Sequence, residues 1–366
     1  MEAIKTIVNK VSVPSEKKTK QKEYLPKGTL PIIDQGQLLI GGYTNDTSKT
    51  IICDLPVIVF GDHTCCVKYI DFPFGAGADG IKVIKPKEGV LPKYLFYGIQ
   101  YLVFKLSNRG YGRHYQHIEK MSINVPPISQ QERIVSQIEE SLSQLDSAVE
   151  TLKKTKQQLE VYRQAVLKEA FSSCDKVEIQ SVCKHVTDGD HMPPPKAETG
   201  IPFIMISNIV GNTIDWSSTA FVSKEYYDNI GDKRTPKKGD VLYTVTGSFG
   251  IPVLIDFEKE FCFQRHIALL RPNEMIDQEF LFYALQDSSV YSQASKRATG
   301  TAQKTVGLTV LRTINIPFTE SKEKQTEMVS IIKSRLTQCD MVENTVNQSL
   351  QQAEALRQSI LKQAFS

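Results

Sequence analysis

A seven-residue repeat of apolar residues between Ser129 and Phe171 constrains the fold of this chain more than any other feature. The apolar residues are spaced three and four apart, as in the seam of a coiled coil. They are Val135, Ile138, Leu142, Leu145, Val149, Leu152, Leu159, Val166 and Ala170. About 43 residues at about 1.5 Å each predict a helix about 64 Å long. A helix of that length needs a partner to cover its apolar stripe.

The last residues of the chain repeat this segment. An offset of 194 residues, the difference between Phe171 and Phe365, aligns 162–172 with 356–366 at near identity. The repeat indicates a duplication on the scale of a domain, and it predicts that the two long helices pair with each other. The residues expected at their contact are Ile138, Leu142, Leu145, Val149, Leu152, Ile332, Leu336, Val346 and Leu350.

Charged residues interrupt the seam at Lys156, Arg163, Glu343 and Arg357. One interpretation is a frayed or locally hydrated coil. The alternative is a device that fixes register, because a single buried polar contact can set the alignment of two helices at some cost in stability. If the helices are antiparallel, Lys156 is predicted to pair with Glu343.

The duplication divides the chain into four parts. Residues 1–127 and 173–318 each show short apolar runs separated by Gly, Pro and Asp turn signals, together with one helical segment, which is typical of a mixed, strand-rich domain. Residues 128–172 and 319–366 are the long helices. The expected fold class is α+β, with two mixed α/β domains in tandem, each followed by a long helix, and with the helices forming an antiparallel coiled coil.

Composition limits the class of protein. The net charge of the 366 residues is only +3, although 1–127 holds 17 Lys and Arg against 11 Asp and Glu. Net charge therefore does not establish nucleic-acid binding. No apolar run reaches the ~18 residues of a membrane span, and 1–22 lacks the apolar core of a signal peptide. Seven cysteines without a CxxC pair predict reduced thiols and no metal site. We expect a soluble, cytoplasmic protein.

Two loops at matching places in the halves, within 107–115 and 295–304, combine basic residues with glycine and with Tyr, His, Thr or Gln. Basic groups beside glycine can approach a phosphate backbone closely, and the other side chains can reach base edges. The alternative is a pair of solvated surface loops. The predicted DNA contacts are Arg109, Tyr111, Arg113, His114, Tyr115, Lys296, Arg297, Thr299, Thr301, Gln303 and Lys304, with His191 added from the proline-rich run 187–195.

Motifs for catalysis are missing from the sequence. It contains neither the GxxxxGK[ST] phosphate loop nor the HExxH metal motif. The Asp190–His191 pair precedes three prolines, which favour a rigid surface loop over a catalytic site. We therefore predict a chain that is not itself an enzyme and carries no cofactor.

This layout resembles the specificity (S) subunit of type I restriction-modification systems. The resemblance covers essentially the whole chain and is most evident in Ile123–Val135 and Ile314–Val329, where an extended segment ending in proline leads into each long helix. It implies a non-catalytic subunit that reads a bipartite site in double-stranded DNA. It also implies two SAM-dependent adenine methyltransferase (M) subunits and ATP-driven restriction (R) subunits as partners.

Antiparallel helices from a duplicated chain are expected to invert one domain relative to the other, which matches the dyad of duplex DNA. Two alternatives stay open. A stand-alone DNA-binding regulator would need no M partner. A coiled-coil scaffold for two protein-binding modules would show no salt-dependent affinity for nucleic acid.

Overall fold

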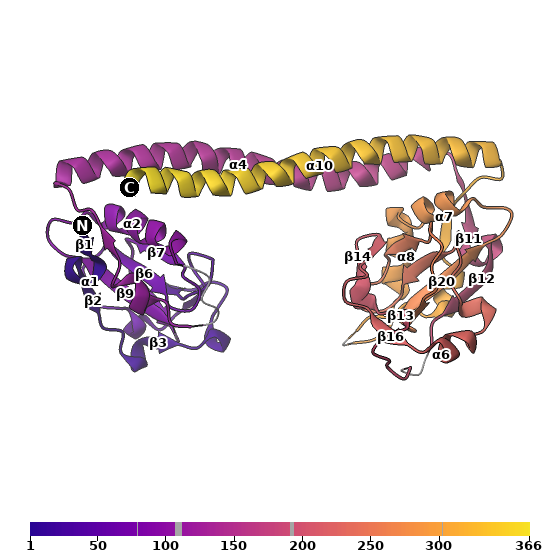
Figure 1. The fold of residues 1–366 in the computed structure, drawn as a ribbon, viewed down its shortest axis with the longest axis horizontal. Coiled ribbons are helices and arrows are strands. Elements are labelled where there is room, and N and C mark those ends of the chain that lie inside the picture. Colours follow the sequence, from indigo (N-terminus) through magenta and orange to yellow (C-terminus); the bar gives the residue numbers. More distant parts are fainter. Residues whose placement is uncertain (79, 107–111, 191–193, 302) are drawn as a thin grey trace. The chain divides into compact units, whose positions relative to one another are not determined.

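The computed structural model describes residues 1–78, 80–106, 112–190, 194–301 and 303–366. It forms two compact units, of which the first contains Met1–Lys153 and Asn347–Ser366 and the second contains Lys154–Val346. Figure 1 shows both units as mixed α/β domains with long helices. The limits of the units lie inside the long helices, so that each unit includes a segment of both.

The first unit is built on two four-stranded sheets, with strand orders β2-β9-β6-β7 and β3-β8-β4-β5, and on a short pair β1-β10. Its strands are β1 (Glu2–Ala3), β2 (Val8–Val11), β3 (Lys18–Thr19), β4 (Leu30–Ile33), β5 (Gly42–Thr44), β6 (Val57–Gly61), β7 (Val67–Ile70), β8 (Gly75–Gly77), β9 (Ile81–Pro86) and β10 (Ser122–Ile123). Its shorter helices are α1 (Ile4–Ile7), α2 (Pro92–Phe104) and α3 (Tyr115–Ile118).

The second unit repeats the main sheet and the short strand pair of the first, whereas its second sheet has three strands and it contains an additional pair, β14-β15. Its main sheet has the order β12-β20-β17-β18, its second sheet β16-β13-β19, and β11 pairs with β21 as β1 pairs with β10. The strands are β11 (Asp175–Glu178), β12 (Cys183–Asp188), β13 (Ile201–Ile204), β14 (Ile209–Val210), β15 (Thr213–Ile214), β16 (Ala220–Val222), β17 (Val241–Thr244), β18 (Pro252–Leu254), β19 (Cys262–Phe263), β20 (Ile267–Pro272) and β21 (Asn315–Phe318). The shorter helices are α5 (Ile179–Val182), α6 (Lys224–Asp228), α7 (Gln278–Ala284), α8 (Ser288–Arg297) and α9 (Leu308–Arg312).

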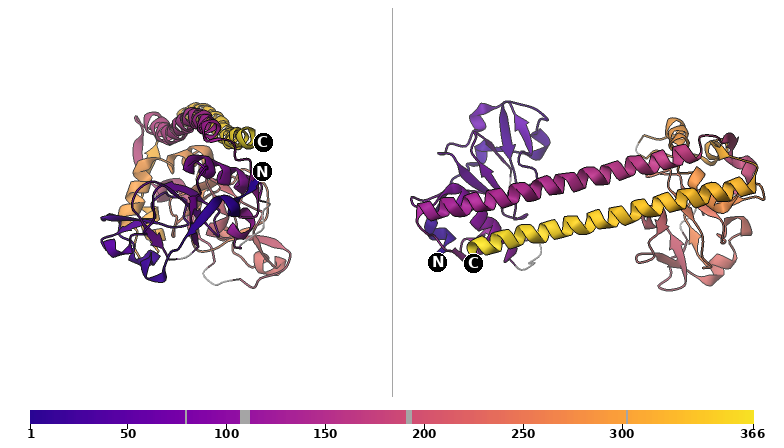
Figure 2. Two further views of the ribbon diagram at one scale, coloured as in Figure 1. Left: turned by 90° about the vertical axis from the view of Figure 1, so that its left-hand side faces the viewer. Right: turned by 90° about the horizontal axis from the view of Figure 1, so that it is seen from above.

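The two long helices are α4 (Ile128–Ala170), of 43 residues, and α10 (Lys322–Phe365), of 44 residues. They lie side by side and run in opposite directions (Figures 1 and 2). In the first unit the start of α4 shares a core with the end of α10, and in the second unit the end of α4 shares a core with the start of α10. The predicted fold class, with two tandem domains and an antiparallel helix pair, is confirmed.

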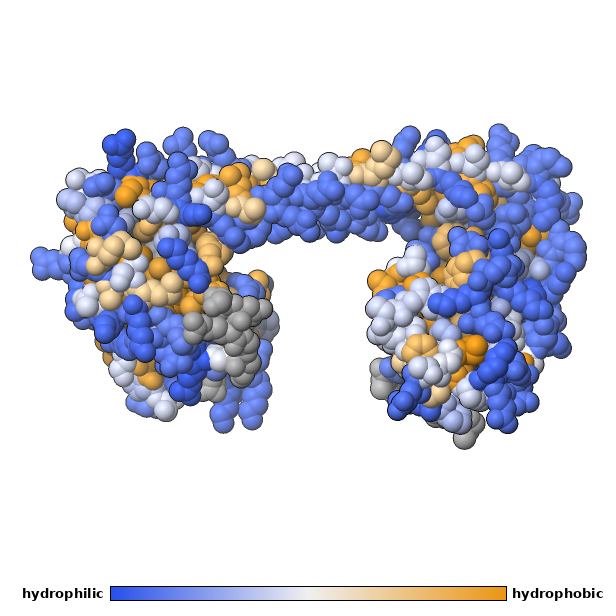
Figure 3. Space-filling view, in the orientation of Figure 1, coloured by the Kyte–Doolittle hydropathy of each residue, from blue (hydrophilic) through white to orange (hydrophobic). Residues whose placement is uncertain are grey.

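The predicted seam residues face the interior of the units. Ile138, Leu142, Leu145, Ile332 and Val346 are buried, and the other four, Val149, Leu152, Leu336 and Leu350, are half-buried. The apolar stripe of α4 packs on the domain as well as on the partner helix, because Ile138, Leu142 and Leu145 belong to the same core as Leu95 of α2. Figure 3 shows hydrophilic residues along most of the visible surface of the paired helices.

Charged seam residues form ion pairs that the duplication relates to each other. Arg163 lies 2.6 Å from Asp340, and the residues 194 positions away on each partner, Arg357 and Asp146, pair as well. Glu343 accepts from Arg163 at 3.0 Å and lies 3.5 Å from Lys156, so the predicted Lys156–Glu343 pair is present. Matched pairs in both units agree with a register-fixing role for these charges.

A buried glutamine holds each long helix to the domain that precedes it. Gln131 is 0% exposed, and its amide group accepts from the Leu91 nitrogen at 2.8 Å and donates to the carbonyl oxygens of Gly89 and Pro126. Gln325, 194 residues later, is also 0% exposed and makes the same three kinds of hydrogen bond. It accepts from the Asp277 nitrogen at 2.6 Å and donates to the Met275 and Thr319 carbonyls.

Replacing Gln131 with leucine is expected to lower the free energy of unfolding of the first unit by about 2–3 kcal/mol. The change leaves buried backbone groups without partners, at about 1–3 kcal/mol for each unsatisfied group. Gln130→Leu is the matched control, because Gln130 is the adjacent residue and is exposed. Denaturant unfolding followed by circular dichroism measures both variants, and equal stability of the two would contradict the anchoring role.

Candidate nucleic-acid interface

One end of the main sheet of the second unit gathers three loops. β20 begins where β12 and β17 end, since Asp188 is paired with Ala268 and Thr244 with Ile267. The segment before β20 and the segments after β12 and β17 therefore meet at the same place. Loops at the end of a rigid sheet are the usual position of binding residues.

The segment before β20 is a tight turn of residues 264–266, called here the 264–266 turn. Its backbone is hydrogen-bonded to three other segments. The bonds run from Gln264 N to Ile204 O at 3.0 Å, from Arg265 N to Asp190 O at 3.2 Å, and from Val245 N to His266 O at 2.9 Å. Gly189 is required beside it, because a Cβ atom there would lie 2.0 Å from the Phe263 oxygen.

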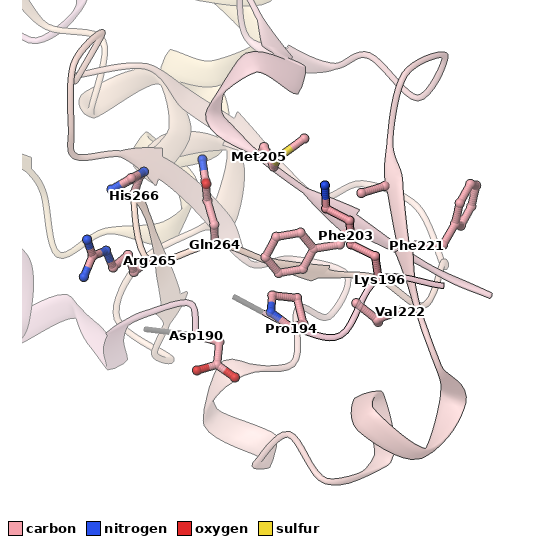
Figure 4. A pocket seen from close by; sticks show the side chains of 11 residues that line it. Asp190, Pro194, Lys196, Phe203, Met205, Phe221, Val222, Gln264, Arg265 and His266 are labelled. Carbon is pink, nitrogen blue, oxygen red and sulfur yellow. The ribbon is translucent and has the colours of Figure 1, made fainter. Parts of the chain in front are cut away.

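The side chains of the 264–266 turn are directed outward from this fixed backbone. Arg265 is exposed, whereas Gln264 and His266 are half-buried. All three line a cavity of about 290 Å³ together with Phe203, Met205, Phe221 and other residues (Figure 4). In Figure 4, Arg265 and His266 lie along one side of the cavity, and Phe221 lies on the other. Burial and the nearby charge of Arg265 lower the pKa of His266, which favours its neutral form.

The loop predicted around Thr299 is a hairpin, called here the 299–305 hairpin, whose residue 302 lies outside the described part. Thr299 and Thr305 exchange backbone hydrogen bonds of 2.9 and 2.7 Å, and Gly247 donates to the Lys304 carbonyl at 2.9 Å. Gly300 has a φ of +104°, which glycine adopts without strain. Thr299, Thr301, Gln303 and Lys304 are exposed. A second cavity, lined by Arg265, His266 and Thr305, joins the hairpin to the turn.

The sequence predicts Lys296 and Arg297 in the same loop, but in the structure they form the last turn of α8. Helical structure continues through them because the Asp287 side chain caps α8 by accepting from the Ser289 nitrogen at 2.9 Å, and because basic residues are favourable at a helix C-terminus. Lys296 is exposed and available to a ligand. The guanidinium group of Arg297 donates to the oxygens of Thr313, including the carbonyl at 3.2 Å.

In the first unit, the described part of the predicted loop is attached to the end of β6. The Asp62 carbonyl accepts from the His114 nitrogen at 2.8 Å, and the Asp62 carboxylate accepts from the Tyr115 nitrogen at 2.9 Å. Arg113 is exposed, and the Gly112 carbonyl lies 3.1 Å from Nδ1 of His63. Residues 112–115 thus lie at a place equivalent to that of the 299–305 hairpin, which is attached to the end of β17.

Two residues of this loop have structural roles instead of the expected contacts with DNA. Tyr115 is 3% exposed, and its ring centroid lies 5.7 Å from that of Phe60. Burial raises the pKa of Tyr115 to about 12. His114 is 9% exposed. The core therefore leaves little of either side chain open to a ligand. Arg109, Tyr111 and His191 lie outside the described residues.

The residues of the 264–266 turn and Lys196 line the cavity in Figure 4. The sequence pattern does not identify them as binding residues. The only available signal was the run Gln264-Arg265-His266 itself, placed between two strands. Within the ranges that the structure describes, no group of three His, Cys, Asp or Glu side chains is arranged to hold a metal ion. In the same ranges, no helix is long and apolar enough to cross a membrane.

The fold and the loops define a class of protein with two tandem domains of similar topology. The domains are joined to paired antiparallel helices, and each presents basic groups at the equivalent end of its main sheet. The sequence model of the family described as "Type I restriction modification DNA specificity domain" matches residues 4–161 and 174–352. The chain therefore belongs to this family.

Curated relatives and solved structures agree with this assignment. The chain is 25% identical over 271 residues to the type I restriction enzyme MjaVIII specificity subunit of Methanocaldococcus jannaschii, a match that covers 66% of this chain and 62% of the relative. It is 24% identical over 272 residues to the EcoBI specificity subunit of Escherichia coli, covering 66% and 57%. The chain thus spans less than two thirds of the length of these relatives.

Two solved structures share the fold. A chain from a study of complex assembly and conformational transition of the type I R-M system matches with a TM-score of 0.72 at 16% identity, covering 100% of this chain and 96% of that one. The HsdS subunit from Thermoanaerobacter tengcongensis matches with a TM-score of 0.50 at 17% identity, covering 100% and 95%.

Proposed function

We propose that this chain is the specificity subunit of a type I restriction-modification system. In this role it catalyses no reaction itself. Each unit reads one half of a bipartite site in double-stranded DNA, and the chain assembles with two methyltransferase subunits and with restriction subunits in the cytoplasm. Family membership supports the role.

The observation that carries the proposal is the repetition of one topology with different side chains at the equivalent end of the main sheet. In the first unit the site holds Arg113 and His63, and in the second it holds the 264–266 turn and the 299–305 hairpin. A shared scaffold with different polar loops is expected of two domains that read different sequences. Predicted contacts that are exposed support this role. Apart from Arg297, which bonds to Thr313, they are Arg113, Lys296, Thr299, Thr301, Gln303 and Lys304.

Sequencing the methylated sites in the DNA of a host that expresses this chain with its methyltransferase subunit tests the proposal. The expected result is one motif in two parts, separated by unread base pairs. Binding of the purified assembly to duplex DNA should also weaken steeply as salt rises, because phosphate contacts release counterions. A continuous motif would contradict reading by two domains.

The test also separates the alternatives. A stand-alone regulator would bind a split site without a methyltransferase subunit and would leave no methylated motif. A protein-interaction scaffold would show no affinity for DNA that depends on salt. Either result would overturn the proposed function.

A further inference from the structure

We propose that the 264–266 turn is the element with which the second unit reads base edges, whereas most of the basic residues around it are engaged in holding the fold or positioned for phosphate contact. The proposal rests on the proposed function and names specificity-determining residues within it: Gln264 and Arg265, with His266 beside them.

The first argument is that the turn combines a fixed backbone with uncommitted side chains. Its backbone is hydrogen-bonded to the last residue of β13 and to the segments after β12 and β17. Among the described residues, the side chains of Gln264, Arg265 and His266 make no hydrogen bond or ion pair with one another or with other residues, and all three line the cavity in Figure 4. A fixed backbone with free polar side chains is pre-organised for a ligand, because little ordering remains to be done on binding.

The second argument is the contrast with other arginines of the same unit, which are bonded within the protein. Arg271 pairs with Asp240 at 2.8 Å. Arg297 bonds to Thr313, and Arg312 donates to the Val186 carbonyl at 2.8 Å. Arg265 has no such partner among the described residues, and it is exposed. Its guanidinium group keeps its donors available for an external acceptor.

The third argument is chemical. Arginine can donate two parallel hydrogen bonds to O6 and N7 of guanine, and glutamine can bond N6 and N7 of adenine in a bidentate manner. His266, whose neutral form is favoured by burial and by Arg265, adds one donor and one acceptor to this pair. Amide, guanidinium and imidazole groups on three successive residues form a set suited to base edges, whereas phosphate contacts need only positive charge or donors.

The fourth argument is that this turn is specific to the second unit. Gln264 bridges to Asp190 in parallel orientation, as Gly77 pairs with Thr19 in the first unit. Gly77 is followed in the sequence by Ala78, Asp79 and Gly80, which lack a comparable set of side chains. The effect of changing the turn should therefore be confined to one half of the DNA site.

The experiment compares the methylated motifs obtained with the full chain and with its Gln264→Ala and Arg265→Ala variants, each expressed with the methyltransferase subunit. We expect one half of the motif to become degenerate at one or two positions while the other half stays unchanged. A second measurement uses the purified assembly and compares its affinity for the intact site with its affinity for duplexes altered at those positions. The ratio of the two affinities should be about 5- to 100-fold smaller in the variants than in the unchanged protein.

Lys238→Ala is the matched control. It removes one positive charge from an exposed residue of the same unit, before the opposite end of β17. The motif should be unchanged in this variant. Fluorescence of Trp216, the single tryptophan of the chain, reports whether the second unit of each variant remains folded.

Two outcomes would overturn the inference while leaving the proposed function standing. In one, the wild-type chain yields a split motif and both turn variants yield the same motif. In the other, the turn variants weaken binding equally for all sequences and reduce its salt dependence, which would make Arg265 a phosphate contact. If the wild-type chain itself yields no split motif, the proposed function fails, and this inference fails with it.

Discussion

Replacing Phe365 with alanine is expected to destabilise the first unit by about 3–5 kcal/mol, although Phe365 lies at the far end of the sequence from most of that unit. The ring is 5% exposed, and its centroid lies 4.9 Å from that of Tyr94 and 5.7 Å from that of Tyr101. A Cβ atom added at Gly98 of α2 would lie 3.2 Å from the Phe365 ring. The absence of a side chain at this glycine therefore leaves room for the ring. The cost comes from lost burial and from the cavity that remains.

The duplication supplies a reciprocal experiment. Phe171, the equivalent residue directly after α4, lies in the core of the second unit with its ring centroid 5.3 Å from that of Phe280. Phe171→Ala should therefore destabilise the second unit by a similar amount. Trp216 belongs to that unit, so its fluorescence separates the two effects: the unfolding midpoint should shift with Phe171→Ala and stay in place with Phe365→Ala.

Circular dichroism, which reports both units, should detect the loss in either variant. Leu356→Ala is the matched control, because Leu356 lies on the same helix and is 51% exposed. If Phe365→Ala were no more destabilising than this control, the C-terminal segment would not be part of the first core.

These aromatic residues explain why the two helix ends are nearly identical in sequence. Each end fills an equivalent slot, against Tyr94 of α2 or Phe280 of α7. The sequence repeat made the duplication and the helices predictable, and the expected segments 128–172 and 319–366 differ from α4 and α10 by at most three residues at either end. The repeat does not show on which domain the end of each long helix packs. The same pattern of apolar residues would allow a helix end to pack on its own domain or on the other.

The candidate site was less predictable for two physical reasons. Tyr115 lies two residues after the exposed Arg113, yet the core covers it, because its backbone nitrogen donates to the Asp62 carboxylate and its ring packs against Phe60. The 264–266 turn has no counterpart of similar composition in the first half, so comparison of the halves did not reveal it. Its position follows from hydrogen bonds to Asp190, Ile204 and Val245, which no spacing pattern encodes.

Removing the carboxylate of Asp240 is expected to cost the second unit about 3–5 kcal/mol, because it leaves a largely buried arginine without its counter-charge. The side chains of Asp240 and Arg271 are 3% and 14% exposed, and both oxygens of Asp240 accept from Arg271, at 2.9 and 2.8 Å. The carboxylate also accepts from the Lys237 nitrogen at 2.8 Å. A bidentate pair of this kind is among the stronger contacts of a protein interior.

The pair also holds a neighbouring segment in place. Arg271 donates to the Thr235 carbonyl at 2.8 Å and to the Asp232 carbonyl at 3.3 Å, and between these two residues lies Arg234, which reaches Asp188 at 3.7 Å. Asp240→Ala should therefore release the 232–237 segment as well as destabilise the fold. The midpoint of unfolding by denaturant, followed by Trp216 fluorescence, measures the loss.

Two further variants identify its cause. Asp232→Ala removes a partner of Arg271 that is 70% exposed, and it should cost less than about 1 kcal/mol, as exposed ion pairs usually do. Asp240→Ala combined with Arg271→Met removes both charges and should recover part of the stability, because no unpaired charge remains in the interior. The loss of stability in the double variant could instead equal the sum of the losses in the two single variants. The cost would then come from packing, and the charge pair would not be what stabilises this part of the second unit.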